Sequence, residues 1–350
     1  MNLKKRILVA PLNWGLGHAT RCIPIINALI TNGFQPVIAS DGSALSLLKK
    51  EFPNLNFIEL PSYNIKYSKK GSRLKLTLLK DSPKILKAIK SENKVIQDFI
   101  SSNAIDGIIS DNRFGVYSKH IPSVFLTHQL KVLSGNTTWL SSKIHHKAML
   151  NFDECWVPDL ETGTNLSGDL GHSKKVRTTT KHIGPLSRFN NYDIPIKYDL
   201  MVLLSGPEPQ RSMLETKLLS ELKHYKKTIL FIRGIVEAQQ QITVKNNISI
   251  YNFMTSKEIE RSIIESKLIL SRSGYTTIMD LTKLQKKAFF IPTPGQYEQI
   301  YLAEKFQKEH VAHFCNQQDF NIEKLKEVKH FKGFSGVQSN IDYQELFSLF

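Results

Sequence analysis

Short apolar runs alternate along the chain with longer segments in which apolar residues recur at every third or fourth position, a spacing typical of amphipathic helices. The short runs are typical of buried strands, because they are continuous and bounded by turn-forming residues. In the first half the pattern predicts strands at residues 6–11, 35–39, 57–60, 105–110, 123–127 and 152–157, and helices at 20–32 and 82–101, the latter opening with Ser82 and Pro83. In the second half it predicts strands at 200–205, 228–233, 248–251, 267–271 and 288–292, and helices at 213–223, 256–266, 275–284 and 297–309.

Strands separated by helices predict parallel sheets with right-handed crossovers. A chain of 350 residues is also long for one hydrophobic core. A loop-rich break around Gly184-Pro185 interrupts the alternation. We therefore expect an α/β protein of two Rossmann-like domains, at residues 1–185 and 199–350, joined by a linker at 186–198. The last helix is expected to pack back on the N-terminal domain.

The N-terminus begins like a secretory signal, with Lys4-Lys5-Arg6 ahead of an apolar stretch. That stretch ends by Asn13, and no small-residue cleavage pattern follows it. A buried first strand fits better, and no apolar run reaches the length of about 18 residues needed to span a bilayer. Three scattered cysteines are too few for a disulfide framework or a zinc site. We expect a cytoplasmic protein.

The chain is strongly basic, with 47 Lys and Arg against 31 Asp and Glu and a net charge of +16. Such an excess favours anionic partners, which include nucleic acid, an acidic membrane surface and phosphorylated small molecules. No helix-turn-helix, zinc-finger or RNP-like aromatic motif accompanies the charge, so a nucleic-acid partner is not expected.

Residues 64–94 hold much of the basic charge, with ten Lys and Arg residues and two acidic residues, Asp81 and Glu92. Apolar residues are interleaved with these charges. A solvated basic helix is one interpretation. The other is docking on an anionic membrane surface, which would place the protein peripherally on the inner face of the cytoplasmic membrane.

The first conspicuous motif lies between the first strand and the first helix, where Asn13 is followed by Gly15, Gly17 and His18. Glycines let a backbone approach a ligand closely, and a helix N-terminus offers unpaired N–H groups. The dinucleotide fingerprint would need a third glycine where Thr20 stands, although Asp41 could act as its ribose-binding acid. An NAD site is therefore the weaker interpretation. His18 is either a catalytic residue or a structural histidine.

Two motifs in the second half have a related design. The segment from Ser271 to Asp280 runs from a strand end through Gly274 into a helix, and the segment from Pro292 to Gln299 opens the next helix. Two helix N-termini at one sheet edge would suit a diphosphate. Ordinary helix capping is the alternative for each motif taken alone.

Together these motifs resemble the family 28 glycosyltransferases of the GT-B fold, the group of the lipid-II-forming N-acetylglucosaminyltransferase and the galactolipid synthases. The motifs that carry the resemblance are Gly15-x-Gly17-His18, Leu204-Ser205-Gly206, Ser271-Arg272-Ser273-Gly274 with Asp280, and the run from Gln296 to Gln299. The resemblance implies that the two Rossmann-like domains face each other across a cleft.

The resemblance also implies a role for each motif. The C-terminal domain would hold a nucleotide-sugar, expected to be a UDP-sugar, with no other cofactor. Its donor-side residues are Ser205 and Gly206 for the phosphates, Phe253 and Met254 for uracil, Arg272, Ser273 and Gly274 in the same pocket, Asp280 for the ribose, and Gln296, Glu298 and Gln299 for the sugar. The acceptor-side residues are Asn13, Gly15, Gly17, Arg21 and His128. A lipid-linked acceptor would suit the basic stretch at residues 64–94.

The expected chemistry is attack of an acceptor hydroxyl on the anomeric carbon, with inversion, which requires a base. His18 and Asp111 are the candidates, His18 being favoured and the carboxylate orienting the imidazole. His128 is third, whereas His145 and His146 are expected to face solvent. No Asp-x-Asp motif occurs, so no metal site is expected, and helix N-termini with Arg272 would offset the charge of the leaving diphosphate.

Two other functions remain open. A UDP-N-acetylglucosamine 2-epimerase would use the same fold and nucleotide site without an acceptor. A nucleic-acid-binding protein without enzymatic activity would account for the net charge alone.

Overall fold

The computed structural model describes residues 4–63, 74–173, 175–336 and 341–350. They form two compact units, which are described separately. The N-terminal unit holds residues 4–63, 75–186 and 341–350, and the C-terminal unit holds residues 187–336.

The N-terminal unit is built on a seven-stranded parallel sheet in the order β3-β2-β1-β4-β5-β6-β7. Its strands are β1 (Arg6–Pro11), β2 (Gln35–Ser40), β3 (Asn56–Glu59), β4 (Gly107–Asp111), β5 (Ser123–Leu126), β6 (Glu154–Val157) and β7 (Thr179–His182). The chain runs outward from β1 to β3, then restarts at β4 beside β1 and runs outward to β7. This doubly wound order places the switch of direction between β1 and β4.

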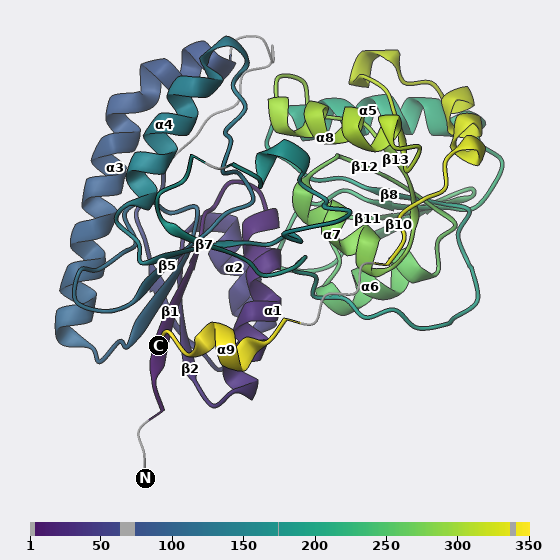
Figure 1. Ribbon diagram of the computed structural model, residues 1–350. Coiled ribbons are helices and arrows are strands. Elements are labelled where there is room, and N and C mark those ends of the chain that lie inside the picture. Colours follow the sequence, from purple (N-terminus) through teal and green to yellow (C-terminus); the bar gives the residue numbers. More distant parts are fainter. Residues whose placement is uncertain (1–3, 64–73, 174, 337–340) are drawn as a thin grey trace. The chain divides into compact units, whose positions relative to one another are not determined.

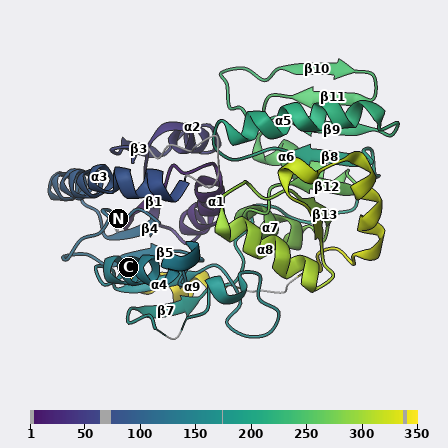
Figure 2. The same cartoon turned by 90° about the horizontal axis from the view of Figure 1, so that it is seen from above.

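Helices lie on both faces of this sheet, with α1 and α3 on opposite sides (Figures 1 and 2). The helices of the unit are α1 (Gly17–Thr31), α2 (Gly42–Glu51), α3 (Leu74–Ser102), α4 (Thr138–Met149) and α9 (Tyr343–Phe347). Leu8 and Ala10 of β1 join Ile96 of α3 in one buried cluster. Their burial fits a strand that is covered on both faces and therefore reads as a continuous apolar run.

The C-terminal unit repeats the design with a second seven-stranded sheet in the order β10-β11-β9-β8-β12-β13-β14. Its strands are β8 (Leu200–Leu203), β9 (Ile229–Ile232), β10 (Ile242–Lys245), β11 (Ile248–Tyr251), β12 (Leu268–Ser271), β13 (Lys287–Phe290) and β14 (His313–Phe314). All pairs are parallel except β10 with β11, which form an antiparallel hairpin at the edge. Here the switch of direction lies between β8 and β12.

The helices of the C-terminal unit are α5 (Gln210–Glu221), α6 (Ser256–Ile264), α7 (Tyr275–Lys283) and α8 (Tyr297–Lys308), followed by a 3-10 segment (Ile322–His330). Leu214 and Leu218 of α5 pack with Val202 of β8 and Phe231 of β9 in one core cluster. Two parallel sheets with flanking helices confirm the predicted α/β class.

Some elements differ from the predictions. The predicted start of a helix at Ser82 is wrong, because α3 begins at Leu74 and passes through Pro83. The residues before Ser82 are mainly Leu and Lys, which have high helix propensity, and this propensity outweighs the backbone hydrogen bond that proline cannot make. The sequence pattern also missed α4, whose apolar residues Trp139 and Ile144 face outward, and β10, which is exposed throughout.

The C-terminal helix α9 belongs to the N-terminal unit (Figure 1), where it contacts the turn between α1 and β2 and strand β6. The Phe347 ring lies 5.6 Å from that of Phe34, and the Phe350 ring lies 6.1 Å from that of Trp156. Lys5 Nζ donates to the Phe350 carbonyl at 2.6 Å. Within the described ranges, no helix is both long and apolar enough to cross a bilayer.

Candidate functional site

The switch point of the N-terminal sheet brings the two candidate bases together. Pro11 at the end of β1 pairs in register with Asp111 at the end of β4. His18, in the first turn of α1, places its Nδ1 atom 2.9 Å from Oδ1 of Asp111. Ligands of doubly wound sheets bind at this position, beyond the carboxyl ends of the strands.

The loop between β1 and α1 determines how His18 is presented. Gly15 has a φ of +78°, a backbone conformation that glycine adopts without strain, and a side chain there would meet open space. The chain then enters α1 at Gly17. His18 and Arg21 are three residues apart on this helix, so their side chains share one face.

Arg21 is buried beneath His18 and binds several members of the site. Its Nε atom donates to Asp111 Oδ2 at 2.6 Å, and its Nη2 atom donates to Oδ1 of the same carboxylate. Its Nη1 atom lies 2.9 Å from Nδ1 of His128, which follows β5. The structure therefore brings His18, Asp111, Arg21 and His128 into one hydrogen-bonded cluster.

The electrostatics of this cluster favour a charged carboxylate beside a neutral imidazole. Burial acts to raise the pKa of Asp111, but the charge of Arg21 and the hydrogen bonds from Arg21 and His18 outweigh it and hold the pKa well below its usual range. Burial lowers the pKa of His18, and Arg21 lowers it further, while Asp111 opposes both. A neutral imidazole that contacts a carboxylate can accept a proton.

A second buried polar cluster stands beside the first, and sequence reasoning missed it. Arg113 donates to Asp41 at 2.6 Å and also to Glu92 of α3. Asn13, expected to face the acceptor, donates to Asp41 at 3.0 Å and accepts from Ser43 at the start of α2. Because both the Asp41 and Asn13 side chains are occupied, the interpretation of Asp41 as a ribose-binding acid of an NAD site is not supported.

Asn112, a residue type that tolerates a left-handed backbone, separates the two clusters along the chain. It has a φ of +57° directly after β4. Its neighbours Asp111 and Arg113 consequently point to different clusters, one to Arg21 and the other to Glu92.

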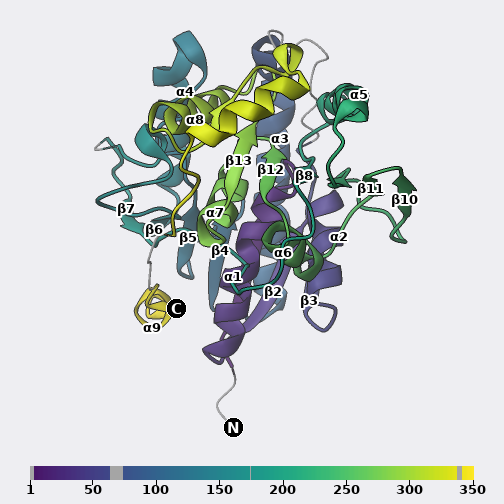
Figure 3. The ribbon, with the colours of Figure 1, turned by 90° about the vertical axis from the view of Figure 1, so that its right-hand side faces the viewer.

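In the C-terminal unit, three donor-side motifs follow three neighbouring strands. Ser205-Gly206 follows β8, Arg272–Gly274 follows β12, and the segment from Thr293 to Gln299 follows β13. Figure 3 shows β8, β12 and β13 in adjacent positions. The motifs therefore share the carboxyl edge of the sheet at its switch point, the position where doubly wound sheets bind ligands.

Arg272 lies enclosed among the loops that follow the strands of the C-terminal sheet. Its buried guanidinium donates to the carbonyls of Ile291, Pro292 and Gln210 and to the side chain of Gln317, at 2.8–3.1 Å. Burial lowers the pKa of Arg272 to about 9. The side chain is fully enclosed and joins the loops after β12 and β13, so the expected offset of the diphosphate charge would act through the charge of Arg272 and stays a prediction.

Ser273 and Gln299 hold the two helix-opening loops together. The Ser273 hydroxyl donates to the Gln299 carbonyl at 2.7 Å, and the Gln299 side chain accepts from the Thr293 N–H at 2.8 Å. The Thr293 hydroxyl is buried without a hydrogen-bond partner among the described atoms. A Cβ atom on Gly206 would lie 3.9 Å from that hydroxyl. Thr293 thus lies among the residues expected on the donor side, although sequence reasoning did not select it.

The other donor-side residues vary in how open they are. Gly206 has a φ of +101°, which restricts this loop position to glycine, and a Cβ on Gly274 would meet open space. Gln296 is the N-cap residue of α8, and Glu298 lies in its first turn, partly exposed.

Phe253 and Met254 are the residues expected to read uracil. At Phe253 the N–H donates to Asn252 and the carbonyl accepts from Gln240. Met254 Sδ accepts from Ser262 at 3.4 Å.

Asp280 lies in α7, where its carboxylate is buried. It accepts a hydrogen bond from Ser187 at 2.7 Å. Burial raises the pKa of Asp280 to about 6, while Arg188 and the Ser187 hydrogen bond oppose the rise. A carboxylate held in this way is costly to the fold, and such perturbed groups cluster at functional sites.

The expectation that His145 faces solvent is wrong. His145 is buried on α4, with its ring 5.4 Å from that of Phe114 and 5.5 Å from that of Phe125. Burial lowers its pKa to about 3. His146 is partly buried and bonds the Leu130 carbonyl at 2.6 Å.

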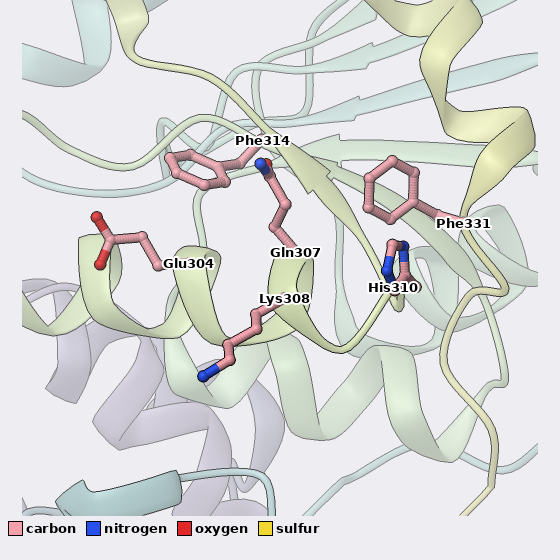
Figure 4. A pocket seen from close by; sticks show the side chains of 6 residues that line it. All are labelled: Glu304, Gln307, Lys308, His310, Phe314 and Phe331. Atoms are coloured by element: carbon pink, nitrogen blue, oxygen red, sulfur yellow. The ribbon is translucent and has the colours of Figure 1, made fainter.

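A surface pocket of about 450 Å³ lies in the C-terminal unit. It is lined by Glu304, Gln307, Lys308, His310, Phe314 and Phe331. Figure 4 shows Gln307 near Phe314, and His310 near Phe331. Its residues come from the C-terminal half of α8, the turn after it, β14 and the end of the 3-10 segment, whereas Gln296 and Glu298 lie at the N-terminal end of α8. None of its lining residues is a predicted site residue.

Comparison with known proteins relates the chain to glycosyltransferases. Residues 210–330 match the glycosyltransferase family 28 C-terminal domain. The chain is 25% identical over 342 residues to the UDP-N-acetylglucosamine–N-acetylmuramyl-(pentapeptide) pyrophosphoryl-undecaprenol N-acetylglucosamine transferase of Buchnera aphidicola subsp. Schizaphis graminum, covering 94% of this chain and 89% of that protein.

Solved structures share the fold at low sequence identity. The spinosyn forosaminyltransferase SpnP aligns with a TM-score of 0.62 at 11% identity, covering 93% of this chain and 90% of that chain. The glycosyltransferase SnogD from Streptomyces nogalater aligns with a TM-score of 0.56 at 12% identity, with the same coverage.

Proposed function

We propose that this chain, a GT-B glycosyltransferase of family 28, moves a sugar from a UDP-sugar to the hydroxyl of a lipid-linked acceptor with inversion. The observation that carries this proposal is the His18–Asp111 pair, 2.9 Å apart at the switch point of the N-terminal sheet. It supplies the base that an acceptor hydroxyl needs.

The proposed step moves one sugar and one proton. The acceptor oxygen forms a bond to the anomeric carbon, and the bond from that carbon to the phosphate oxygen breaks. The electron pair of the broken bond leaves with UDP, and the acceptor proton passes to Nε2 of His18. Asp111 stabilises the imidazolium that results, because its carboxylate stays charged at 2.9 Å from Nδ1.

On the donor side, we propose that the N-termini of α7 and α8 face the diphosphate. Unpaired N–H groups and the helix dipole favour a phosphate at such a position. The Thr293 hydroxyl, buried and without a partner among the described atoms, is placed to donate to a phosphate oxygen near Gly206. Asp280 is proposed to accept from the ribose hydroxyls, and Glu298 and Gln299 to contact the sugar.

The test is a thermal-shift panel of UDP-, dTDP- and GDP-sugars, followed by product mass analysis on lipid extracts with the best donor. We expect a UDP-sugar to stabilise the protein and a glycosylated lipid to form. Conversion of UDP-N-acetylglucosamine to its 2-epimer without an acceptor would instead identify an epimerase. Salt-sensitive binding of an oligonucleotide without turnover would identify a nucleic-acid-binding protein.

Transfer is expected to proceed without a divalent metal. The sequence holds no Asp-x-Asp motif, the arrangement that would offer paired carboxylates to a metal bound to the diphosphate. We expect UDP to raise the melting temperature equally with and without Mg²⁺, and EDTA to leave turnover unchanged. Turnover that EDTA abolishes and Mg²⁺ or Mn²⁺ restores would overturn this expectation.

The acceptor is proposed from the relative in Buchnera, whose name specifies a pyrophosphoryl-undecaprenol substrate. An acceptor of this kind stays in a membrane, so the enzyme must reach a bilayer surface. We propose that the protein is cytoplasmic and binds peripherally to the inner face of the cytoplasmic membrane. Most of the basic stretch at residues 64–94 lies outside the residues whose side chains are described, but Lys84, Lys87 and Lys90 on α3 are exposed.

Helix α4 offers a second surface suited to an anionic bilayer. Trp139, Leu140 and Ile144 are 69%, 41% and 63% exposed, an unusual display for large apolar side chains. Lys143 and Lys147 are exposed on the same helix, one and two turns after Trp139. A face that combines tryptophan, aliphatic and lysine side chains is typical of helices that lie in a membrane interface.

Reversing the charge of Lys84, Lys87 and Lys90 to glutamate is expected to weaken binding to anionic liposomes by about 100-fold, since each basic residue near the surface contributes ~1 kcal/mol. Trp139→Ser with Ile144→Ser should also weaken it by removing apolar contacts. Liposome flotation measures both, and UDP affinity should not change. The matched control for the charge reversal changes Lys223, Lys226 and Lys227 to glutamate, and the control for the apolar substitutions is Val244→Ser. All four residues are exposed in the C-terminal unit. A parent protein that does not bind anionic liposomes would end the membrane proposal.

A further inference from the structure

Two histidines in the N-terminal cluster share one buried guanidinium. Arg21 Nη2 lies 2.9 Å from Nδ1 of His18, and Arg21 Nη1 lies 2.9 Å from Nδ1 of His128. The same guanidinium also donates to both oxygens of Asp111. Arg21 thus contacts every ionisable side chain that faces His18.

The contact with His128 determines which ring nitrogen carries the proton. An arginine side chain has only donors and stays protonated. Nδ1 of His128 must therefore accept, which places the proton of the neutral ring on Nε2. His128 is held as a hydrogen-bond donor through Nε2.

The contact with His18 is different, because Nδ1 of His18 has two neighbours. It lies 2.9 Å from Oδ1 of Asp111, which can only accept, and 2.9 Å from Nη2 of Arg21, which can only donate. A neutral ring protonated on Nδ1 donates to Asp111 and leaves Nε2 free as a base. A neutral ring protonated on Nε2 accepts from Arg21. Both neutral forms are hydrogen-bonded, whereas a charged ring places two cations side by side.

We propose that Arg21 is a positioning residue that holds the proton of His128 on Nε2 and keeps His18 neutral, so that His18 is ready to act as a base. The groups that face His18 are Arg21 on the same helix, Asp111 at the end of β4, and His128 after β5. Of these, Arg21 is the permanent cation and Asp111 the permanent anion. Asp111 is also contacted by Asn112 at 3.2 Å and by Cys22 at 3.6 Å, neither of which is charged there.

The consequence for turnover rests on the proposed function, but the protonation states do not. Removal of Arg21 would leave Asp111 uncompensated beside His18 and would remove the repelling cation. Both changes favour the imidazolium. The pKa of His18 should therefore rise. As the pH falls, the unprotonated imidazole that acts as the base would then be lost at a higher pH than in the parent protein.

The experiment compares Arg21→Gln and Arg21→Lys with the parent protein by ¹⁵N NMR of labelled histidine across pH. In the parent, His128 should show a protonated Nε2 and an unprotonated Nδ1. In Arg21→Gln, the titration midpoint of His18 should rise by about one pH unit or more, the shift typical of a charge at this distance. Arg21→Lys keeps the charge but lacks the planar fork, so the His18 midpoint should stay near that of the parent while His128 loses its fixed tautomer.

Turnover supplies a second readout. In Arg21→Gln, the acid limb of the plot of kcat/KM against pH should move to higher pH together with the His18 midpoint. Arg21→Lys should lower kcat without moving this limb. Arg261→Gln is the control, since its guanidinium is 69% exposed and pairs with Glu265 four residues further along the chain. Should Arg21→Gln fail to fold, the parent spectrum and Arg21→Lys still decide the question.

A parent His128 protonated on Nδ1, or a His18 midpoint unmoved in a folded Arg21→Gln, would overturn the proposal. Absence of sugar transfer with the parent protein would instead overturn the proposed function and leave the protonation result standing. The two failures are therefore distinguishable.

Discussion

Replacement of His18 by alanine is expected to lower turnover by about 10²–10⁴-fold, the range contributed by a general base, and to leave UDP binding unchanged. The proposed proton acceptor would be lost, while every donor-side residue belongs to the other unit. The measurement is kcat with saturating donor and acceptor, together with calorimetric titration of UDP into each protein.

Two further variants sharpen this test. His120→Ala changes an exposed histidine of the same unit and should behave as the parent does. Asp111→Asn keeps the shape of the side chain but removes the carboxylate that orients the imidazole, so it should lose most of the activity as well. If His18→Ala retained near-normal turnover while Asp111→Asn lost it, the role of base would pass to Asp111.

Replacement of Asp280 by asparagine is expected to weaken UDP binding and yet stabilise the protein. Loss of charge-assisted hydrogen bonds to the ribose should cost roughly 1.5–3 kcal/mol in donor affinity. Burial raises the pKa of Asp280 to about 6, so its charged form is disfavoured in the folded protein. The free energy of unfolding should rise by at most about 3 kcal/mol, because a pKa of Asp280 that folding raises by about two units corresponds to that penalty.

The pH dependence of this gain has a definite sign. A carboxyl group whose pKa is raised by folding destabilises the fold above that pKa, and the penalty disappears as protonation proceeds. The advantage of Asp280→Asn in melting temperature should therefore be present at pH 8, shrink as the pH falls through about 6 and vanish near pH 4. Affinity of the parent for UDP should fall over the same interval, because a protonated carboxyl no longer accepts as strongly.

Asp199→Asn is the matched control. Asp199 pairs with Lys267 at 2.8 Å, and this hydrogen bond lowers its pKa instead of raising it. Its replacement should not stabilise the protein and should not alter UDP affinity. Parent-like UDP binding in Asp280→Asn would show that the donor site is misplaced, whatever its effect on melting temperature.

Sequence reasoning succeeded where the physical rule acts over a short stretch of chain. Buried parallel strands such as β1 and β12 read as apolar runs, and the loops after them stand out by their glycines. Because the carboxyl ends of parallel strands share one edge, the nearness of His18 to Asp111 followed from their positions after β1 and in β4.

Sequence reasoning failed where the contacts that decide a side chain's position join segments that are distant in sequence. Arg272 has the sequence position of a phosphate ligand, yet its partners lie at Gln210, Ile291 and Gln317. Likewise, nothing local in the sequence indicates that Arg113 will be buried against Glu92. A side chain's partners are set by tertiary packing, which a local pattern does not encode.

The packing of α9 on the N-terminal unit has a consequence for how the protein forms during synthesis. The contact between Lys5 and Phe350 joins residues 345 positions apart, and the rings of Phe347 and Phe350 cover those of Phe34 and Trp156. None of these contacts can form on the ribosome until residues 343–350 have emerged. The nascent N-terminal unit therefore keeps the rings of Phe34 and Trp156 without these contacts while the whole second sheet is translated.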